Sequence, residues 1–222
     1  MKIKFILSLF ILVLISCNQQ KEEVSKINPV EYWGENPWPE IRKKRINTLL
    51  PNALKEANVD CWLVICRENN NDPLADHVGG ENAGGTAAFL FYNDDNGFHS
   101  KVFSPSGEST ALDELNIHDE VVPVERGKSA IKQTVTFIKA QNFSRIAINS
   151  SQSNSTADGL SYTQRQTLES FLGSDANKLV SSTEVVYNWL SIKLPEEVEI
   201  LTKAAELTAQ FQIEAYQQII PG

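Results

Sequence analysis

Apolar positions recur at helical spacing in the first well-patterned segment of the chain. Positions 46, 49, 50, 53, 54 and 57 form one stripe, which predicts a helix over about 41–58. Residues 60–66 follow as a continuous apolar run, the pattern of a strand that is buried on both faces. Apolar runs at 87–92 and 98–103 flank the polar turn 93–97 (Asn-Asp-Asp-Asn-Gly), so we expect an antiparallel hairpin there.

The rest of the chain alternates short strands with helices. We expect strands at 121–124 and 145–149, and helices at 129–141, 162–172 and 184–190. A long helix begins at Pro195, because proline suits the first helical position and the glutamates at 196, 197 and 199 favour its positive end. Its expected packing face comprises Val198, Leu201, Ala205, Thr208, Phe211, Ala215 and Ile219. This order predicts an α/β domain with a mixed β-sheet flanked by helices.

The first residues of the chain follow another pattern. Lys2 and Lys4 precede an apolar run of 11 residues, 5–15, whereas a helix needs about 20 to cross a hydrocarbon core. A charged start, a short apolar core and a small residue before the cut are typical of a secretory signal peptide. Residues 14–17 (Leu-Ile-Ser-Cys) resemble the lipobox of bacterial lipoproteins, which implies that the Cys17 thiol takes a diacylglyceryl group. The alternative is an ordinary signal peptide with an incidental cysteine.

Removal of residues 1–16 leaves 206 residues and changes the formal charge from −8 to −10, because two lysines are lost. Residues 17–39 are polar and then proline-punctuated, which predicts a tether with little fixed structure. Two or more acyl chains anchor a protein stably. We therefore expect a protein of the cell envelope, lipid-anchored to a bacterial membrane on its periplasmic or surface side. So acidic a chain repels nucleic acid, and no nucleic-acid partner is expected.

Motifs that carry chemistry are few. Cys61 and Cys66 are an odd number of positions apart in a predicted strand, so we expect two small buried side chains on opposite faces, too far apart to bridge. Residues 126–129 (Arg-Gly-Lys-Ser) resemble the tail of a phosphate-binding P-loop. That motif needs a glycine at position 122, which is valine, and a good buried strand before it. Nucleotide binding is therefore not predicted.

The long polar loop 67–86 holds the remaining candidates. Its glycine pairs, at 79–80 and 84–85, do not fit a dinucleotide fingerprint and predict a mobile loop. Arg67, Asp72 and His77 lie in this loop, where functional residues often occur, although a plain solvated histidine is the alternative for His77. The three histidines of the chain lack metal-ligand spacing. No catalytic residue and no metal ligand is predicted.

Five segments, in order, resemble the creatinase-like amino-terminal domain of Xaa-Pro aminopeptidases, prolidases and creatinase. Residues 67–73 (Arg-Glu-Asn-Asn-Asn-Asp-Pro) are similar to the Arg-Glu-x-Asn-x-Asp-Pro turn of the bacterial members. The other segments are residues 39–50 running into 58–64, residues 77–86 with the hairpin after them, residues 148–150 with 157–161, and residues 179–182 with 184–186, Trp189, Lys193 and the helix to position 222. The resemblance spans residues 39–222.

The resemblance implies a domain at 40–193 and the first helix of a "pita-bread" catalytic domain at 194–222. In this family the catalytic domain binds two divalent metal ions, such as manganese, cobalt or zinc, through two aspartates, a histidine and two glutamates. None of those positions can be assigned in this chain. The family also implies a homodimer in the full-length protein and peptide substrates. It further implies that loops of the amino-terminal domain border an active site, and Arg67, Asp72 and His77 are the residues to watch.

Two hypotheses of different classes follow. The first is the non-catalytic amino-terminal portion of a lipid-anchored Xaa-Pro-type metallopeptidase, a truncated chain that is inactive alone. The second is a stand-alone lipoprotein that uses the domain for binding or assembly. The sequence beyond position 222 distinguishes the two hypotheses.

Overall fold

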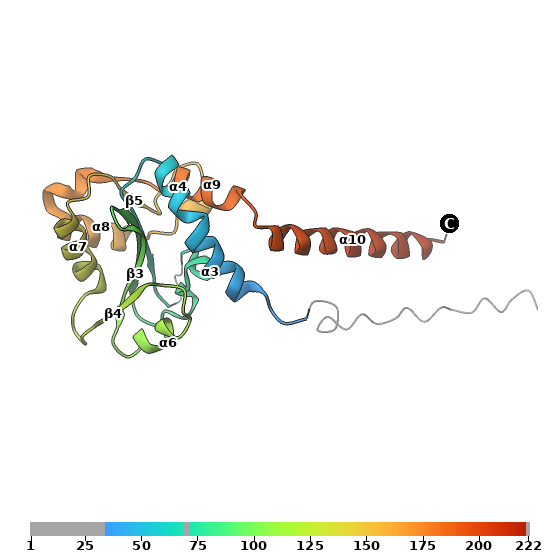
Figure 1. Ribbon diagram of the computed structural model, residues 1–222, viewed down its shortest axis with the longest axis horizontal. Coiled ribbons are helices and arrows are strands. Elements are labelled where there is room, and N and C mark those ends of the chain that lie inside the picture. The colour runs from blue at the N-terminus through green and yellow to red at the C-terminus, as the bar shows by residue number, and fades with distance from the viewer. Residues whose placement is uncertain (1–33, 69–71, 221–222) are drawn as a thin grey trace, which may run out of the picture. The chain divides into compact units, whose positions relative to one another are not determined.

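A computed structural model describes residues 34–68 and 72–220 (Figure 1). Cys17, the signal peptide and most of the tether lie outside the described residues. The body of the domain is one six-stranded sheet in the order β4-β3-β2-β1-β5-β6. Its strands are β1 (Cys61–Cys66), β2 (Ala87–Asp94), β3 (Gly97–Pro105), β4 (Glu120–Val124), β5 (Ile146–Ile148) and β6 (Leu179–Ser181). The mixed α/β fold that the sequence predicts is confirmed.

The sheet is mixed because only β2 runs against its neighbours. β2 pairs antiparallel with both β1 and β3, whereas the pairs β1–β5, β5–β6 and β3–β4 are parallel. The predicted hairpin is present, with Asp94 opposite Gly97 at its turn. Five strands therefore end at the same edge of the sheet. Ligands of open α/β sheets bind at such an edge, outside the carboxyl ends of the strands.

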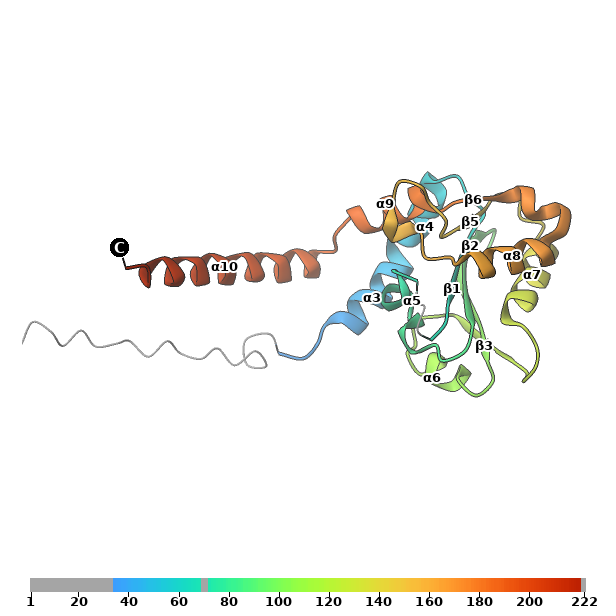
Figure 2. The same ribbon diagram turned by 180° about the vertical axis from the view of Figure 1, so that it is seen from behind.

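Helices cover both faces of the sheet (Figures 1 and 2). One face carries α3 (Trp38–Thr48), α4 (Leu50–Glu56), α5 (Ala75–Val78), α6 (Ser109–Asp113) and α9 (Thr183–Ser191), and the other carries α7 (Ala130–Gln141) and α8 (Tyr162–Leu172). Short 3₁₀ turns occur at Gly80–Asn82, Ser155–Ala157 and Gly173–Lys178. Strand β1 is buried along its whole length, as its unbroken apolar run predicts. The short elements α6 and β6 were not predicted.

Alternation along β1 divides its side chains between two cores. Cys61, Leu63 and Ile65 belong to the core under α7 and α8, whereas Trp62, Val64 and Cys66 belong to the core under α4 and α9. The two cysteines are thus free, buried and on opposite faces, as predicted. Burial raises the pKa of the Cys66 thiol to about 12, and the pKa of Cys61 also lies well above its usual range.

The expected helix over 41–58 is wrong as a single element. It is broken at Leu49 into α3 and α4, and Pro51 occupies the first turn of α4. Proline has no N–H to donate to the carbonyl one turn earlier, so it ends one helix and suits the start of the next. The apolar stripe survives the break because Ile46, Leu50 and Leu54 are all buried in the same core.

The loop 67–86 is also more structured than predicted. It contains α5 and a 3₁₀ turn, and Gly79 adopts a left-handed conformation with φ of 80° that ends α5. Gly80 is packed so closely that a Cβ there would lie 2.5 Å from Cys66 Sγ. The described part of this loop is therefore held against the core, and the predicted mobile loop is not found there.

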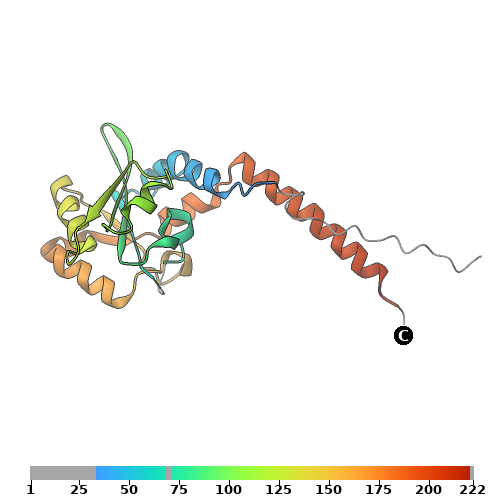
Figure 3. The ribbon, with the colours of Figure 1, turned by 90° about the horizontal axis from the view of Figure 1, so that it is seen from below.

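The last helix, α10 (Pro195–Gln217), runs clear of the layers around the sheet (Figure 3). None of its residues is buried, so its predicted packing face has no partner among the described residues. Val198, Leu201 and Phe211 are each about half exposed. No helix within residues 34–68 and 72–220 is long and apolar enough to cross a membrane.

Candidate functional site

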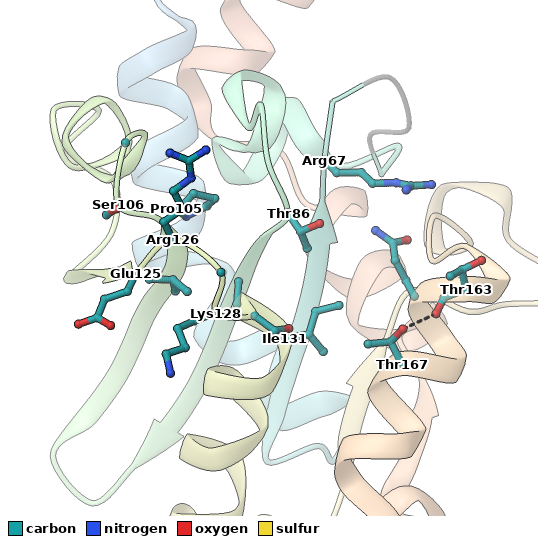
Figure 4. A pocket seen from close by; sticks show the side chains of 16 residues that line it. Arg67, Thr86, Pro105, Ser106, Glu125, Arg126, Lys128, Ile131, Thr163 and Thr167 are labelled. Atoms are coloured by element: carbon teal, nitrogen blue, oxygen red, sulfur yellow. Dashed lines mark hydrogen bonds between the residues drawn. The ribbon is translucent and has the colours of Figure 1, made fainter.

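A hollow of about 700 Å³ lies at the carboxyl edge of the sheet (Figure 4). Its lining comes from the end of β1, the start of β2, the ends of β3 and β4, and the first turns of α7 and α8. The volume falls within the range of small-molecule sites, roughly 300–1,000 Å³. This edge is where the topology of the sheet places a ligand site.

The hollow is basic although the chain is acidic. Arg67, Arg126 and Lys128 line it, and Glu125 is the single carboxylate in its lining. Within the described part of the chain, none of the three basic side chains forms a hydrogen bond or an ion pair. Figure 4 shows Arg67 on the side of Thr163 in α8, with Arg126 and Lys128 on the side of β4 and α7.

The three loop candidates of the sequence do not form one site. No hydrogen bond or ion pair joins Arg67, Asp72 and His77 to one another among the described residues. Arg67 is exposed at the basic hollow, whereas the carboxylate of Asp72 is buried and His77 packs between two tryptophans. Although the three residues are close in sequence, their side chains lie in three different environments.

Asp72 belongs to a buried polar network that joins β1 to the residues that follow β5 and β6. Asn149 Nδ2 donates to both carboxylate oxygens of Asp72 at 2.8 Å, and Leu74 N donates to Oδ1 at 2.9 Å. Asn149 Oδ1 accepts from Trp62 Nε1 at 2.8 Å and from Ser182 Oγ at 2.7 Å. Burial raises the pKa of the Asp72 carboxyl, although its hydrogen bonds oppose the shift. We assign Asp72 a structural role, since its oxygens are already satisfied within the fold.

His77 also has a packing environment. Its ring lies edge-on to Trp38 at 5.2 Å and to Trp189 at 5.7 Å between ring centroids. Burial and the nearby Arg45 guanidinium lower the pKa of His77. The alternative of a plain solvated loop histidine is therefore wrong. His77 stabilises the contact between α5, α3 and α9.

Sequence reasoning missed Gln164 and passed over residues 126–129. Gln164 lies in the first turn of α8, lines the hollow and is buried, with 6% of its surface exposed. Its position was visible in the sequence, since Ser161 and Gln164 have the spacing of a capping box. The tail of the apparent P-loop follows β4, the strand expected at 121–124. This strand is a half-exposed edge strand and not the buried strand that a P-loop needs, and Val122 also excludes the motif.

The described residues do not fit a two-metal centre. Among residues 34–68 and 72–220, no three His, Cys, Asp or Glu side chains gather into a group that could hold a metal ion. No step of metal chemistry is therefore assigned to them.

Among known proteins, the chain is similar to solved structures only. No protein-family model and no curated protein sequence matches the chain. The Xaa-Pro dipeptidase from Bacillus anthracis matches with a TM-score of 0.51 and 15% identity, over 83% of this chain and 44% of that one. The X-Pro aminopeptidase from Thermotoga maritima has a TM-score of 0.51 and 18% identity, over 77% and 44%. The dipeptidase PepE from Mycobacterium ulcerans has a TM-score of 0.55 and 15% identity, over 83% and 46%.

These likenesses are likenesses of fold. The chain adopts the mixed α/β fold found in Xaa-Pro dipeptidases and aminopeptidases, in agreement with the creatinase/prolidase amino-terminal domain that its motifs resemble. It spans less than half of the length of each of these three proteins.

Proposed function

We propose that this chain is the non-catalytic amino-terminal portion of a lipid-anchored, Xaa-Pro-type metallopeptidase. The observation that carries the proposal is the fold, which is shared with three peptidases. Each of these peptidases is more than twice as long as the part of it that the chain matches. The hydrolysis of peptide bonds next to proline would occur in a two-metal domain that follows this one. The amino-terminal portion would serve dimerisation, and its loop from Arg67 to Thr86 would border the active site.

The exposed face of α10 supports a following domain. Val198, Leu201, Phe211 and Ile213 are each half exposed or more, and Tyr216 is 70% exposed. An apolar face of this size on a soluble protein marks an interface. The first turn of α10 is nevertheless fixed to the domain, because Arg45 Nη1 lies 2.6 Å from Glu197 Oε2. Because α10 is fixed at its first turn and its apolar side chains are exposed, it is suited to pack against a following domain.

The first experiment compares the 222-residue chain with the complete product of its gene. We expect the gene to continue with a domain that supplies two aspartates, one histidine and two glutamates. The longer product should hydrolyse Xaa-Pro dipeptides and peptides with manganese or cobalt, and the 222-residue chain should not. Turnover is measured by release of the amino-terminal residue, with metal-free enzyme as the control.

Three results would contradict the proposal. Metal-dependent turnover by the 222-residue chain would place the chemistry within these residues. A gene that stops after Gly222 would favour the stand-alone binding or assembly module instead. A gene that continues without the five ligands would indicate a following domain that has lost its metal centre.

The lipid anchor has a test of its own. Changing Cys17 to serine should abolish incorporation of radiolabelled palmitate, since serine has no thiol to take the lipid. The matched control is Cys61→Ala, which removes a buried cysteine of β1 and should leave labelling intact. Equal labelling of the Cys17→Ser chain, or no labelling of the unaltered chain, would show that residues 14–17 are not a lipobox.

A further inference from the structure

A buried hydrogen-bond donor without a partner lines the basic hollow. The side chain of Gln164 turns its Oε1 to the backbone, where it accepts from Ser161 N at 2.9 Å. Its Nε2 is buried and has no acceptor among the described residues. A buried amide left without a hydrogen bond costs free energy, so such groups are rare in folded proteins unless a ligand or water uses them. Gln164 lines the hollow, and because Oε1 is engaged at the helix end, Nε2 is the one amide atom of Gln164 left to bind a ligand.

The opposite wall supplies backbone donors. After β4, a turn closes with a bond from Lys128 N to Glu125 O at 2.9 Å, and Gly127 adopts φ of 82° at its third position. A positive φ at that position is the mark of a turn that favours glycine. Ser129 then caps α7, its Oγ accepting from Lys132 N at 3.3 Å. The N–H groups of Ala130 and Ile131, which also line the hollow, have no partner within the helix.

Three of the four charged side chains that line the hollow are positive. Arg126 and Lys128 flank Gly127 in the turn, Arg67 lies on the other side of the hollow, and Glu125 is the single opposing charge in the lining (Figure 4). The amino end of α7, a helix of 12 residues, adds the positive end of its dipole. Anions bind at helix amino ends for these reasons. Guanidinium, ammonium and free N–H groups together match a tetrahedral oxyanion.

We propose that this hollow binds a phosphate group, carried by inorganic phosphate or by a small phosphate monoester. Arg126, Lys128 and the amino end of α7 would hold the oxygens on one side, and Gln164 Nε2 would donate from the other. Residues 126–129 thus resemble only the Gly-Lys-Ser end of a P-loop. The loop that wraps a nucleotide's phosphates is not formed, because position 122 is valine and not glycine. The site goes beyond the proposed function, since it needs neither metal nor peptide.

The test titrates the purified 222-residue chain, in detergent, by calorimetry at constant chloride. Inorganic phosphate is the first probe and glycerol 3-phosphate the second, with acetate as the competing anion class. Arg126→Gln should weaken phosphate binding by ~10-fold or more, the loss typical of one charge-assisted hydrogen bond. Gln164→Glu should weaken it further, because glutamate keeps an oxygen for Ser161 N but replaces the free donor with a negative charge.

The matched control is Lys55→Gln, which removes one positive charge from the exposed side of α4 and should leave affinity unchanged. Amide spectra give a second readout, in which phosphate should shift the backbone signals of Ala130 and Ile131 and the side-chain signal of Gln164. Tighter binding of glycerol 3-phosphate would identify an ester as the ligand, and equal binding would identify free phosphate. The proposal is overturned if phosphate does not bind, if acetate binds as tightly, or if Lys55→Gln weakens binding as much as Arg126→Gln.

The peptidase assay and this titration can fail separately. If the complete gene product does not hydrolyse Xaa-Pro peptides, phosphate binding is still expected, because the hollow is built from residues of this domain alone. An absence of phosphate binding would likewise leave the fold and the role of α10 as they are.

Discussion

Replacing Arg45 with methionine is expected to lower the free energy of unfolding by about 3–5 kcal/mol, the loss typical of one partner removed from a buried ion pair. Arg45 is the most completely buried charged side chain among the described residues, with 1% of its surface exposed. Its Nη1 contacts Glu197 Oε2 at 2.6 Å and Ile192 O at 3.0 Å, and its Nη2 contacts Trp189 O at 2.5 Å. Methionine keeps much of the stem but supplies none of these bonds.

The loss should lie near the lower end of that range because Glu197 is 16% exposed and water can reach it. One bond of the cluster survives in the variant, since Trp189 Nε1 donates to the backbone oxygen of residue 45 at 3.2 Å. The measurement is urea unfolding followed by tryptophan fluorescence, which reports on Trp62 and Trp189 in this core.

The neighbouring residue supplies the control. Lys44 pairs with Glu196 on the surface, with 47% of each side chain exposed, so Lys44→Met should change stability far less. Arg45→Met combined with Glu197→Gln should regain part of the loss, because glutamine still accepts from Leu194 N and carries no buried charge. Equal effects of Arg45→Met and Lys44→Met would show that this cluster does not fix α10 to the domain.

Local pattern was enough to predict the centre of the sheet. Strand β1 and the hairpin depend on an unbroken apolar run and on turn residues at 93–97, and both appear at the predicted positions. The single helix over 41–58 failed for a reason also present in the sequence, since the missing N–H of Pro51 outweighs the continuous apolar stripe. The short strands expected at 121–124 and 145–149 are present as β4 and β5. The equally short β6 and α6 were missed because neither has a run of buried apolar residues, and α6 buries Leu112 alone.

The candidate site was less accessible to sequence reasoning because its parts meet only in space. Asp72 is held by Asn149, which lies 77 positions further along the chain, so its burial has no local signature. Gln164 is visible as a helix cap, but its free amide nitrogen matters only because α8 faces the turn after β4 across the hollow. The packing face of α10 was predicted from the helical spacing of its apolar residues. That spacing does not show which part of the protein packs against the face.

Lowering the pH from 7 to 4 should reduce the free energy of unfolding by roughly 3 kcal/mol through His118 alone. The reason is that the pKa of His118 is about 4 in the folded protein and 6.5 in the unfolded chain. Burial is the main cause of the low pKa, and the Arg42 guanidinium adds to it, while Asp119 and the Val78 carbonyl oppose it. A depressed histidine pKa means that the unfolded chain binds the proton more tightly. The stability is therefore present above pH 6.5 and is lost as the pH falls towards 4.

The geometry gives the reason for this preference. His118 Nε2 lies 2.9 Å from Val78 O, so the neutral ring carries its proton on Nε2 and donates it there. Nδ1 is buried and has no hydrogen-bond partner among the described residues, and the ring lies against Phe89 and Phe91 with centroids 5.5 and 5.9 Å away. A second proton would have to sit on Nδ1, facing an apolar wall with no acceptor.

The variant His118→Gln isolates this contribution, since glutamine can still donate to Val78 O and does not titrate. The difference in unfolding free energy between the unaltered chain and the variant should fall by roughly 3 kcal/mol between pH 7 and pH 4. Other shifted groups, such as Asp72 and Glu196, are common to both proteins and cancel in this difference. Ring signals of His118 that titrate near 6.5 in the folded protein would contradict the expected result. They would mean that the contacts of His118 with Val78 and with Phe89 and Phe91 of β2 open in solution.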